Sequence, residues 1–239
     1  MIESEIVKAQ ETKRIFKDRK RTNLLRRPEQ WLISFFVKRT PLAITSNILT
    51  GIGFGGSLLV LLGFILAEYG SRYYLLLCIL GLFINWFGDS LDGRIAYYRN
   101  IPRKWYGFSL DIIMDWIGTV LIGLGYLFYA KNDYELAAFI LVVLYGWAMI
   151  ISQLRYKITD EYTIDAGLFG PTEIRILLSI IILGEIIFPD TMQYFVATIC
   201  VALFFINIMD TRKLLRLGNA RDKKERRERR LKAKSFKEE

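Results

Sequence analysis

Long apolar blocks alternate with short polar connections over most of the chain, and this pattern predicts membrane-spanning helices. A bilayer core requires about 20 apolar residues per helix. Six blocks approach or reach that length, at residues 48–67, 73–88, 108–130, 135–154, 174–189 and 191–209. We therefore predict an all-α integral membrane bundle of six transmembrane helices.

Charged segments flank this apolar region at both ends. Residues 1–40 carry a net charge of +6, residues 211–239 carry +8, and residues 41–210 carry −5. In "RTNLLRRPEQWLISFFVKRTP", basic residues alternate with Leu, Trp and Phe, as in an amphipathic helix that lies in the membrane interface. We predict a basic interfacial segment at 1–40, a membrane domain at 41–210 and a basic cytoplasmic tail at 211–239. The tail either is solvated and sets the topology or also attracts anionic lipid.

Positive charge is concentrated in alternate connections between the predicted helices. The second connection contains Arg94, Arg99, Arg103 and Lys104, and the fourth contains Arg155, Lys157 and Arg175. Positive residues near helix ends mark the cytoplasmic side. We therefore expect both termini inside, in the cytoplasmic membrane of a prokaryote-like cell.

Several classes of site are disfavoured by composition and context. The chain has no histidine, and Cys78 and Cys200 both fall in apolar blocks, so no zinc-site spacing exists. No nucleic-acid recognition motif accompanies the basic ends, and we expect no nucleic-acid partner. The stretch "GIGFGG", Gly51 to Gly56, has the spacing of a dinucleotide fingerprint but starts an apolar helix, which predicts close helix packing instead.

Four aspartates interrupt the apolar pattern in "GDSLDGRIAYYRNIPRKWYGFSLDIIMDW". Helical periodicity places Asp89 and Asp92 on one face of a helix, and Asp111 and Asp115 on one face of the next. Four adjacent carboxylates stay ionised only if cations neutralise them. An all-oxygen ligand set suits Mg²⁺, Mn²⁺ or Ca²⁺ rather than zinc. Two other interpretations are helix caps with salt bridges to Arg94, Arg99 and Arg103, and the ion path of a cation transporter or channel.

The acidic stretch resembles the signature of the CDP-alcohol phosphotransferase family, D-x2-D-G-x2-A-R-x8-G-x3-D-x3-D. The residues at its fixed positions are Asp89, Asp92, Gly93, Ala96, Gly107, Asp111 and Asp115. The resemblance extends over about residues 41–210, and "PLAITSNILTGIG" is similar to the family's first-helix entry. It implies an integral membrane enzyme that joins a CDP-linked alcohol to an acceptor alcohol and releases CMP.

The resemblance also implies roles for individual residues. Asp89, Asp92, Asp111 and Asp115 would bind Mg²⁺ or Mn²⁺, as a pair of ions, and Asp115 would also be the general base. Gly93, Ala96 and Gly107 would shape the cytidine and diphosphate site. A homodimer is expected from the resemblance as well.

The chain departs from the signature at two points. Tyr97 replaces the signature Arg, and the following spacer has nine residues, 98–106, instead of eight. Arg94 or Arg99 would then replace the lost charge, or Tyr97 would stack on the base. A relative with altered or lost catalysis is the other interpretation.

The donor and the acceptor are less defined by the sequence. CDP-diacylglycerol is the expected donor, and a soluble CDP-alcohol is the alternative. Arg155, Lys157 and Arg175 carry positive charge that suits a phosphorylated acceptor such as inositol phosphate or glycerol phosphate. Anchoring of the helices by positive charge, with pairing to Glu173, explains the same residues equally well.

Overall fold

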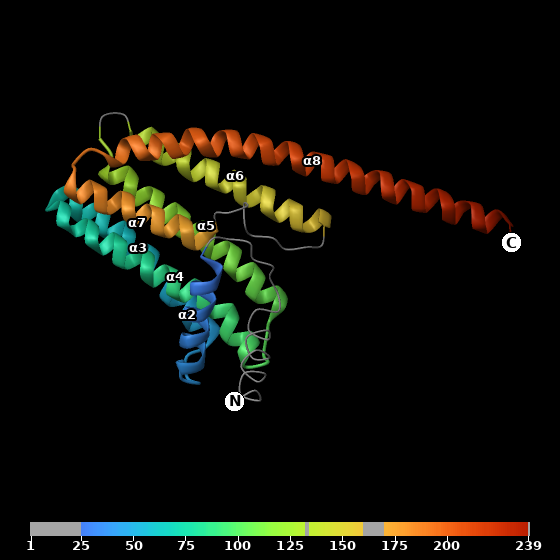
Figure 1. Ribbon diagram of the computed structural model, residues 1–239, viewed down its shortest axis with the longest axis horizontal. Coiled ribbons are helices and arrows are strands. Elements are labelled where there is room, and N and C mark those ends of the chain that lie inside the picture. Colours follow the sequence, from blue (N-terminus) through green and yellow to red (C-terminus); the bar gives the residue numbers. More distant parts are fainter. Residues whose placement is uncertain (1–24, 132–133, 160–169, 239) are drawn as a thin grey trace.

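The computed structural model describes residues 25–131, 134–159 and 170–238, which form helices joined by short connections (Figure 1). Its elements are α2 (Arg26–Arg39), α3 (Ser46–Tyr69), the 3-10 turn η1 (Arg72–Tyr74), α4 (Leu75–Tyr98), α5 (Lys104–Tyr129), α6 (Glu135–Thr159), α7 (Pro171–Ile187) and α8 (Met192–Glu238). The all-α prediction is confirmed for these residues. Most of the predicted interfacial segment, residues 1–24, lies outside them.

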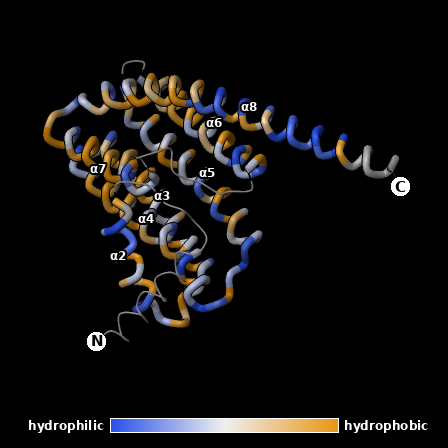
Figure 2. Tube along the Cα trace, turned by 45° about the vertical axis from the view of Figure 1, so that its right-hand side comes forward, coloured by the Kyte–Doolittle hydropathy of each residue, from blue (hydrophilic) through white to orange (hydrophobic). Residues whose placement is uncertain are grey.

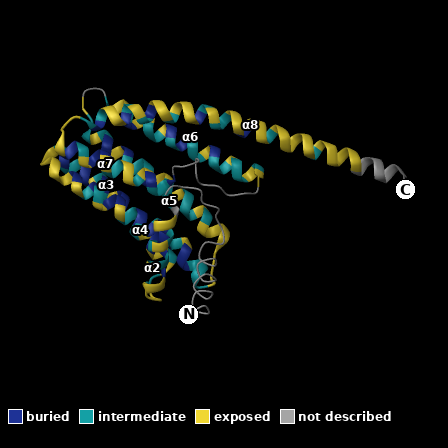
Figure 3. Ribbon diagram, viewed as in Figure 1, coloured by how far each residue is buried: buried dark blue, intermediate teal, exposed yellow. Residues whose placement is uncertain are grey.

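Five helices in the described part of the chain are long and apolar enough to cross a membrane: α3, α4 with η1, α5, α6 and α8. Many of their large apolar residues are exposed, as a lipid-facing surface requires. Figures 2 and 3 show hydrophobic and exposed positions along these helices. The remaining predicted span corresponds to α7, which has 17 residues. This is shorter than the roughly 20 that a bilayer core requires, so the count of six spans stays a prediction.

Helix α3 packs against both α4 and α5, and its contact with α4 depends on glycine. A Cβ built on Gly56 would overlap the backbone nitrogen of Asn85, and one built on Gly88 would overlap the backbone nitrogen of Gly53. The two helix backbones can approach this closely only because small residues face each other. The packing interpretation of the Gly51–Gly56 motif is therefore confirmed for Gly53 and Gly56.

Helix α2 packs across the end of α4 that carries the aspartates. Its Ile33 and Val37 are buried in a small core with Trp86, Leu91 and Ile95, whereas Trp31 is exposed. A helix with one buried and one exposed face agrees with an amphipathic segment. Its position in the membrane interface stays a prediction.

Helix α8 continues without a break through residue 210, where we expect the membrane domain to end. Beyond the rest of the bundle, the part of α8 that Figure 2 colours is mostly hydrophilic. The Arg221 guanidinium donates hydrogen bonds to the carbonyl oxygens of Lys157 and Ile158, at 2.8 and 2.6 Å. These bonds tie the start of the extension to the end of α6.

Candidate metal and nucleotide site

The structure brings three of the four aspartates together. Asp89 of α4 and Asp111 and Asp115 of α5 each offer a carboxylate oxygen, and the three oxygens lie within 4.8 Å of one another. All three side chains are partly buried, and all three residues lie inside helices rather than at caps. The convergence of two helix faces is therefore confirmed for these residues, and the helix-cap interpretation is wrong for them.

Asp92 lies beside this group and has partners of its own. Its Oδ2 accepts a hydrogen bond of 2.7 Å from the Thr50 hydroxyl of α3, and its Oδ1 accepts one from the backbone N–H of Gly93. These bonds fix the carboxylate against α3, one turn beyond Asp89. Asp92 as a metal ligand stays a prediction.

Helix α7 contributes Arg175 to the aspartate group. The Arg175 Nη2 donates to Asp89 Oδ2 at 2.8 Å, and Nε donates to Asn85 Oδ1 at 2.8 Å. Only 16% of the Arg175 side chain is exposed, so solvent screens this ion pair less than it would a surface pair. Arg175 therefore supplies positive charge directly to the aspartates.

Asn85 holds this arrangement together across three helices. Its Nδ2 donates to the carbonyl oxygen of Gly53 and to the Ser57 hydroxyl, both on α3 and both at 3.1 Å. A single amide on α4 thus links α3 to the guanidinium of α7. Neither Asn85 nor Thr50 was predicted from the sequence as a residue of the site. A usable signal existed for Asn85, which lies four residues before Asp89, on the same helix face, in an otherwise apolar run.

Two glycines of the site border open space. A Cβ added at Gly93 or at Gly107 would meet no atom within 4 Å. Helix packing therefore does not require glycine at either position, in contrast to Gly56 and Gly88. Both positions leave room for a ligand to approach the backbone of α4 and of α5.

The remaining residues predicted to bind CDP lie at the end of α4. Ala96 and Tyr97 are partly buried, and Arg94 is buried, with 4% of its surface exposed. The Arg99 guanidinium donates to the carbonyl oxygens of Thr40, Pro41 and Ile44, at 3.2, 2.8 and 2.7 Å. Arg99 thereby holds the connection between α2 and α3, and a role in nucleotide binding stays a prediction for all four residues.

The three residues predicted to bind the acceptor are placed differently from one another. Arg175 joins the aspartates, as described above. Arg155 pairs with Asp210 of α8 at 3.9 Å, and Lys157 is exposed near the end of α6. Acceptor binding by these residues stays a prediction.

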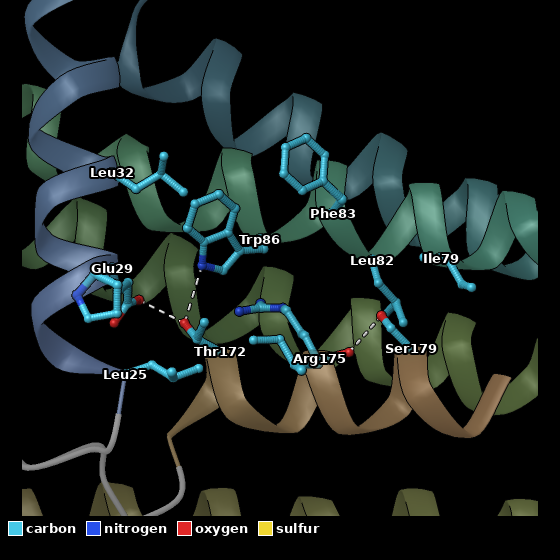
Figure 4. Close-up of a pocket in the computed structure, with 12 residues that line it drawn as sticks. Leu25, Glu29, Leu32, Ile79, Leu82, Phe83, Trp86, Thr172, Arg175 and Ser179 are labelled. Carbon is cyan, nitrogen blue, oxygen red and sulfur yellow. Dashed lines mark hydrogen bonds between the residues drawn. The ribbon is translucent and has the colours of Figure 1, made fainter. Parts of the chain in front are cut away.

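An apolar cavity of about 440 Å³ opens between α2, α4 and α7 (Figure 4). Its lining residues are Leu25, Pro28, Glu29, Leu32, Ile79, Leu82, Phe83, Trp86, Thr172, Arg175, Ile176 and Ser179. On one side of the cavity, Thr172 links α7 to α2 and α4. Its hydroxyl donates a hydrogen bond to Glu29 Oε1 at 2.7 Å and accepts one from Trp86 Nε1 at 3.2 Å. Since Arg175 lines the cavity and also binds Asp89, the cavity borders the aspartate group.

The donor set fits a divalent metal ion. Three carboxylates within 4.8 Å offer oxygen ligands alone, which hard cations such as Mg²⁺ and Mn²⁺ prefer over nitrogen or sulfur. Arg175 compensates part of the negative charge at Asp89, and a bound cation would compensate the rest. The chemistry of the donors does not distinguish between the two metals.

Comparison with known proteins agrees with this site. The family model described as CDP-alcohol phosphatidyltransferase matches residues 43–208, which cover α3 to α7 and the first part of α8. The match spans well over half of the chain and includes every residue of the aspartate group. No curated protein matches the sequence.

Proposed function

Since this chain belongs to the CDP-alcohol phosphatidyltransferase family, we propose that it transfers a phosphatidyl group from CDP-diacylglycerol to an acceptor hydroxyl and releases CMP. The aspartate group carries this proposal, because Asp89, Asp111 and Asp115 converge beside two glycines that border open space. The family consists of membrane transferases of phosphate-containing groups that use divalent metal ions.

In the proposed reaction, Asp115 accepts the proton of the acceptor hydroxyl. The acceptor oxygen forms a bond to the phosphorus that carries diacylglycerol, and the bond from that phosphorus to the bridging oxygen breaks. The electron pair leaves with CMP. A carboxylate as general base suits a chain without histidine.

Asp89, Asp92, Asp111 and Asp115 would hold the divalent ions. When bound, these ions supply positive charge that stabilises the attacking and leaving oxygens. Arg175 orients the carboxylate of Asp89 through its hydrogen bond, and Asn85 in turn holds the Arg175 guanidinium.

The CDP part of the donor is proposed to lie along Gly93, Ala96 and Gly107, with Tyr97 and Arg94 nearby. The open space beside Gly93 and Gly107 supports this position. The apolar cavity between α2, α4 and α7 supports a lipid donor, because acyl chains could enter it while the diphosphate reaches the aspartates. A soluble CDP-alcohol would have no use for such a lining.

A phosphorylated acceptor, inositol phosphate or glycerol phosphate, is proposed because Arg175 is a cation at the aspartate group. A guanidinium binds phosphate oxygens with two parallel hydrogen bonds. Arg155 and Lys157 would contribute positive charge along the approach. We further propose that both termini and the site face the cytoplasm and that the enzyme is a homodimer.

The proposed function is tested by CMP release from the purified protein in detergent. The assay supplies either CDP-diacylglycerol or a soluble CDP-alcohol as donor, with Mg²⁺ or Mn²⁺, and one acceptor at a time: inositol phosphate, glycerol phosphate, serine or inositol. We expect release that requires both a metal and one phosphorylated acceptor. Release only from a soluble CDP-alcohol would contradict the lipid donor, and no release from any donor by folded protein would contradict the transferase.

A second test of the nucleotide site is the variant Gly93→Ala, because Gly93 borders open space. We expect the variant to fold as well as the parent, because the added methyl meets no protein atom within 4 Å. It should bind CDP about tenfold more weakly, since the methyl enters the space proposed for the nucleotide. Binding is measured by calorimetry with metal present.

The matched control is Gly184→Ala, near the end of α7, where an added Cβ also meets nothing within 4 Å. This change should alter neither melting temperature nor CDP affinity. Equal affinity of Gly93→Ala and the parent would remove Gly93 from the nucleotide site.

A further inference from the structure

Arg103 links the first turns of two helices beside the site. It precedes α5 as its N-cap residue, and its Nη2 donates a hydrogen bond to Asn47 Oδ1 in the first turn of α3. The guanidinium carbon lies 4.3 Å from the ring centre of Tyr106, and the Tyr106 hydroxyl accepts a 3.4 Å hydrogen bond from Asn47 Nδ2. The position of Arg103 is therefore defined by contacts to both helices.

This position is close to the aspartates. Thr50 follows Asn47 by three residues on α3 and donates to Asp92, as described above. Residues three apart lie on the same helix face, about one turn or 5 Å along the axis. Arg103 and the Asp92 carboxylate therefore contact neighbouring turns of one face of α3.

Open space adjoins both groups. Gly93 follows Asp92 directly, and the Gly107 N–H donates to the Arg103 carbonyl oxygen at 2.7 Å. An added Cβ at either glycine would meet no atom within 4 Å. Open space therefore borders both the residue that follows Asp92 and the first turn of α5, which Arg103 precedes.

Other cations of the α4–α5 region are placed differently. Arg99 donates to three backbone carbonyl oxygens, and Arg94 is buried within α4. Arg103 is exposed, and its contact with Asn47 uses one of the five N–H donors of a guanidinium. These donors match phosphate oxygens in geometry and charge.

We propose that Arg103 binds the diphosphate of the CDP-linked donor and supplies the positive charge that Tyr97 does not. This inference rests on the proposed function. The longer connection between α4 and α5 agrees with it, because the chain reverses there through Asn100, whose φ of 60° is one that Asn tolerates.

The test is calorimetric binding of CDP, in Mg²⁺ and low salt, to the full-length protein in detergent. Arg103→Gln should weaken binding about tenfold, because a charge-assisted hydrogen bond to phosphate is lost. Arg103→Lys should lose less, because the charge stays. The matched control is Lys104→Gln, which removes the same charge from the adjacent residue, where the ammonium lies 5.2 Å from the ring centre of Trp105.

Tyr97→Arg supplies a readout that a purely structural role would not give. In the Arg103→Gln background, Tyr97→Arg should restore most of the lost affinity, whereas in the parent it should tighten binding by a smaller factor. Loss in Arg103→Gln but not in Lys104→Gln, with this rescue, supports the proposal.

Two results would overturn it. One is equal binding by Arg103→Gln and Lys104→Gln, and the other is a loss that Tyr97→Arg does not restore. If the parent itself releases no CMP and binds no CDP, the proposed function fails instead. Melting temperatures keep these outcomes separate from misfolding, and those of the Arg103 and Lys104 variants should match the parent because both side chains are exposed.

Discussion

Asp115→Asn is expected to yield a folded protein that releases CMP about 10³-fold more slowly than the parent. The amide has nearly the same shape as the carboxylate but accepts no proton at neutral pH, so the acceptor hydroxyl keeps its proton during attack. Asp89 and Asp111 remain, and metal binding should weaken without disappearing. Turnover is measured as CMP release, and metal binding as the Mn²⁺ signal in electron paramagnetic resonance.

The control for this variant is Asp222→Asn. Asp222 is exposed on the second half of α8, so the same chemical change is made away from the aspartate group. It should affect turnover by less than tenfold. If Asp115→Asn retained a tenth or more of the parent rate, another group would have to be the base.

Gly88→Val should destabilise the bundle more than any site substitution. A Cβ at this position overlaps the backbone of Gly53 and the carbonyl oxygen of Leu49, and backbone atoms in a packed helix cannot move aside as a side chain can. Overpacked cores lose about 1–3 kcal/mol when side chains yield, so we expect at least the upper value here. Thermal unfolding in detergent measures the loss of stability. If the loss is large enough, no monodisperse protein will be obtained.

Gly55→Val is the matched control on the facing helix. Gly55 is exposed and an added Cβ meets nothing within 4 Å, so the same substitution should leave the melting temperature nearly unchanged. Equal melting temperatures for Gly88→Val and Gly55→Val would show that the close approach of α3 and α4 does not limit stability.

Local regularity explains why much of this fold was predictable. Uncharged blocks of suitable length located α3 to α8, and helical spacing of the aspartates was enough to bring Asp89 together with Asp111 and Asp115. Both signals repeat within a few residues, so they are visible in a single sequence. The start of α7 was harder to predict, because the helix begins at Pro171, before the apolar block, where Glu173 accepts a hydrogen bond from the Gly170 N–H.

Contacts between distant residues were not predictable in the same way. Arg175 meets Asp89 from 86 residues away, and Thr50 meets Asp92 from 42 residues away. No periodicity relates such pairs, because they depend on how helices are arranged around α3. The glycines show the same limit, since Gly88 and Gly93 differ in role only through what lies opposite each of them.

The length of α8 decides where the charges of the tail act. A helix of 47 residues is about 70 Å long at 1.5 Å per residue, and a bilayer core occupies about 30 Å of it. If α8 crosses the bilayer along its normal, its last turns would stand tens of ångströms from the lipid core, while electrostatic attraction at physiological salt decays over about 8 Å. In that arrangement, basic residues near Arg212 would contact headgroups, whereas Arg229 and Arg230 would lie in the aqueous phase, beyond the reach of lipid charge.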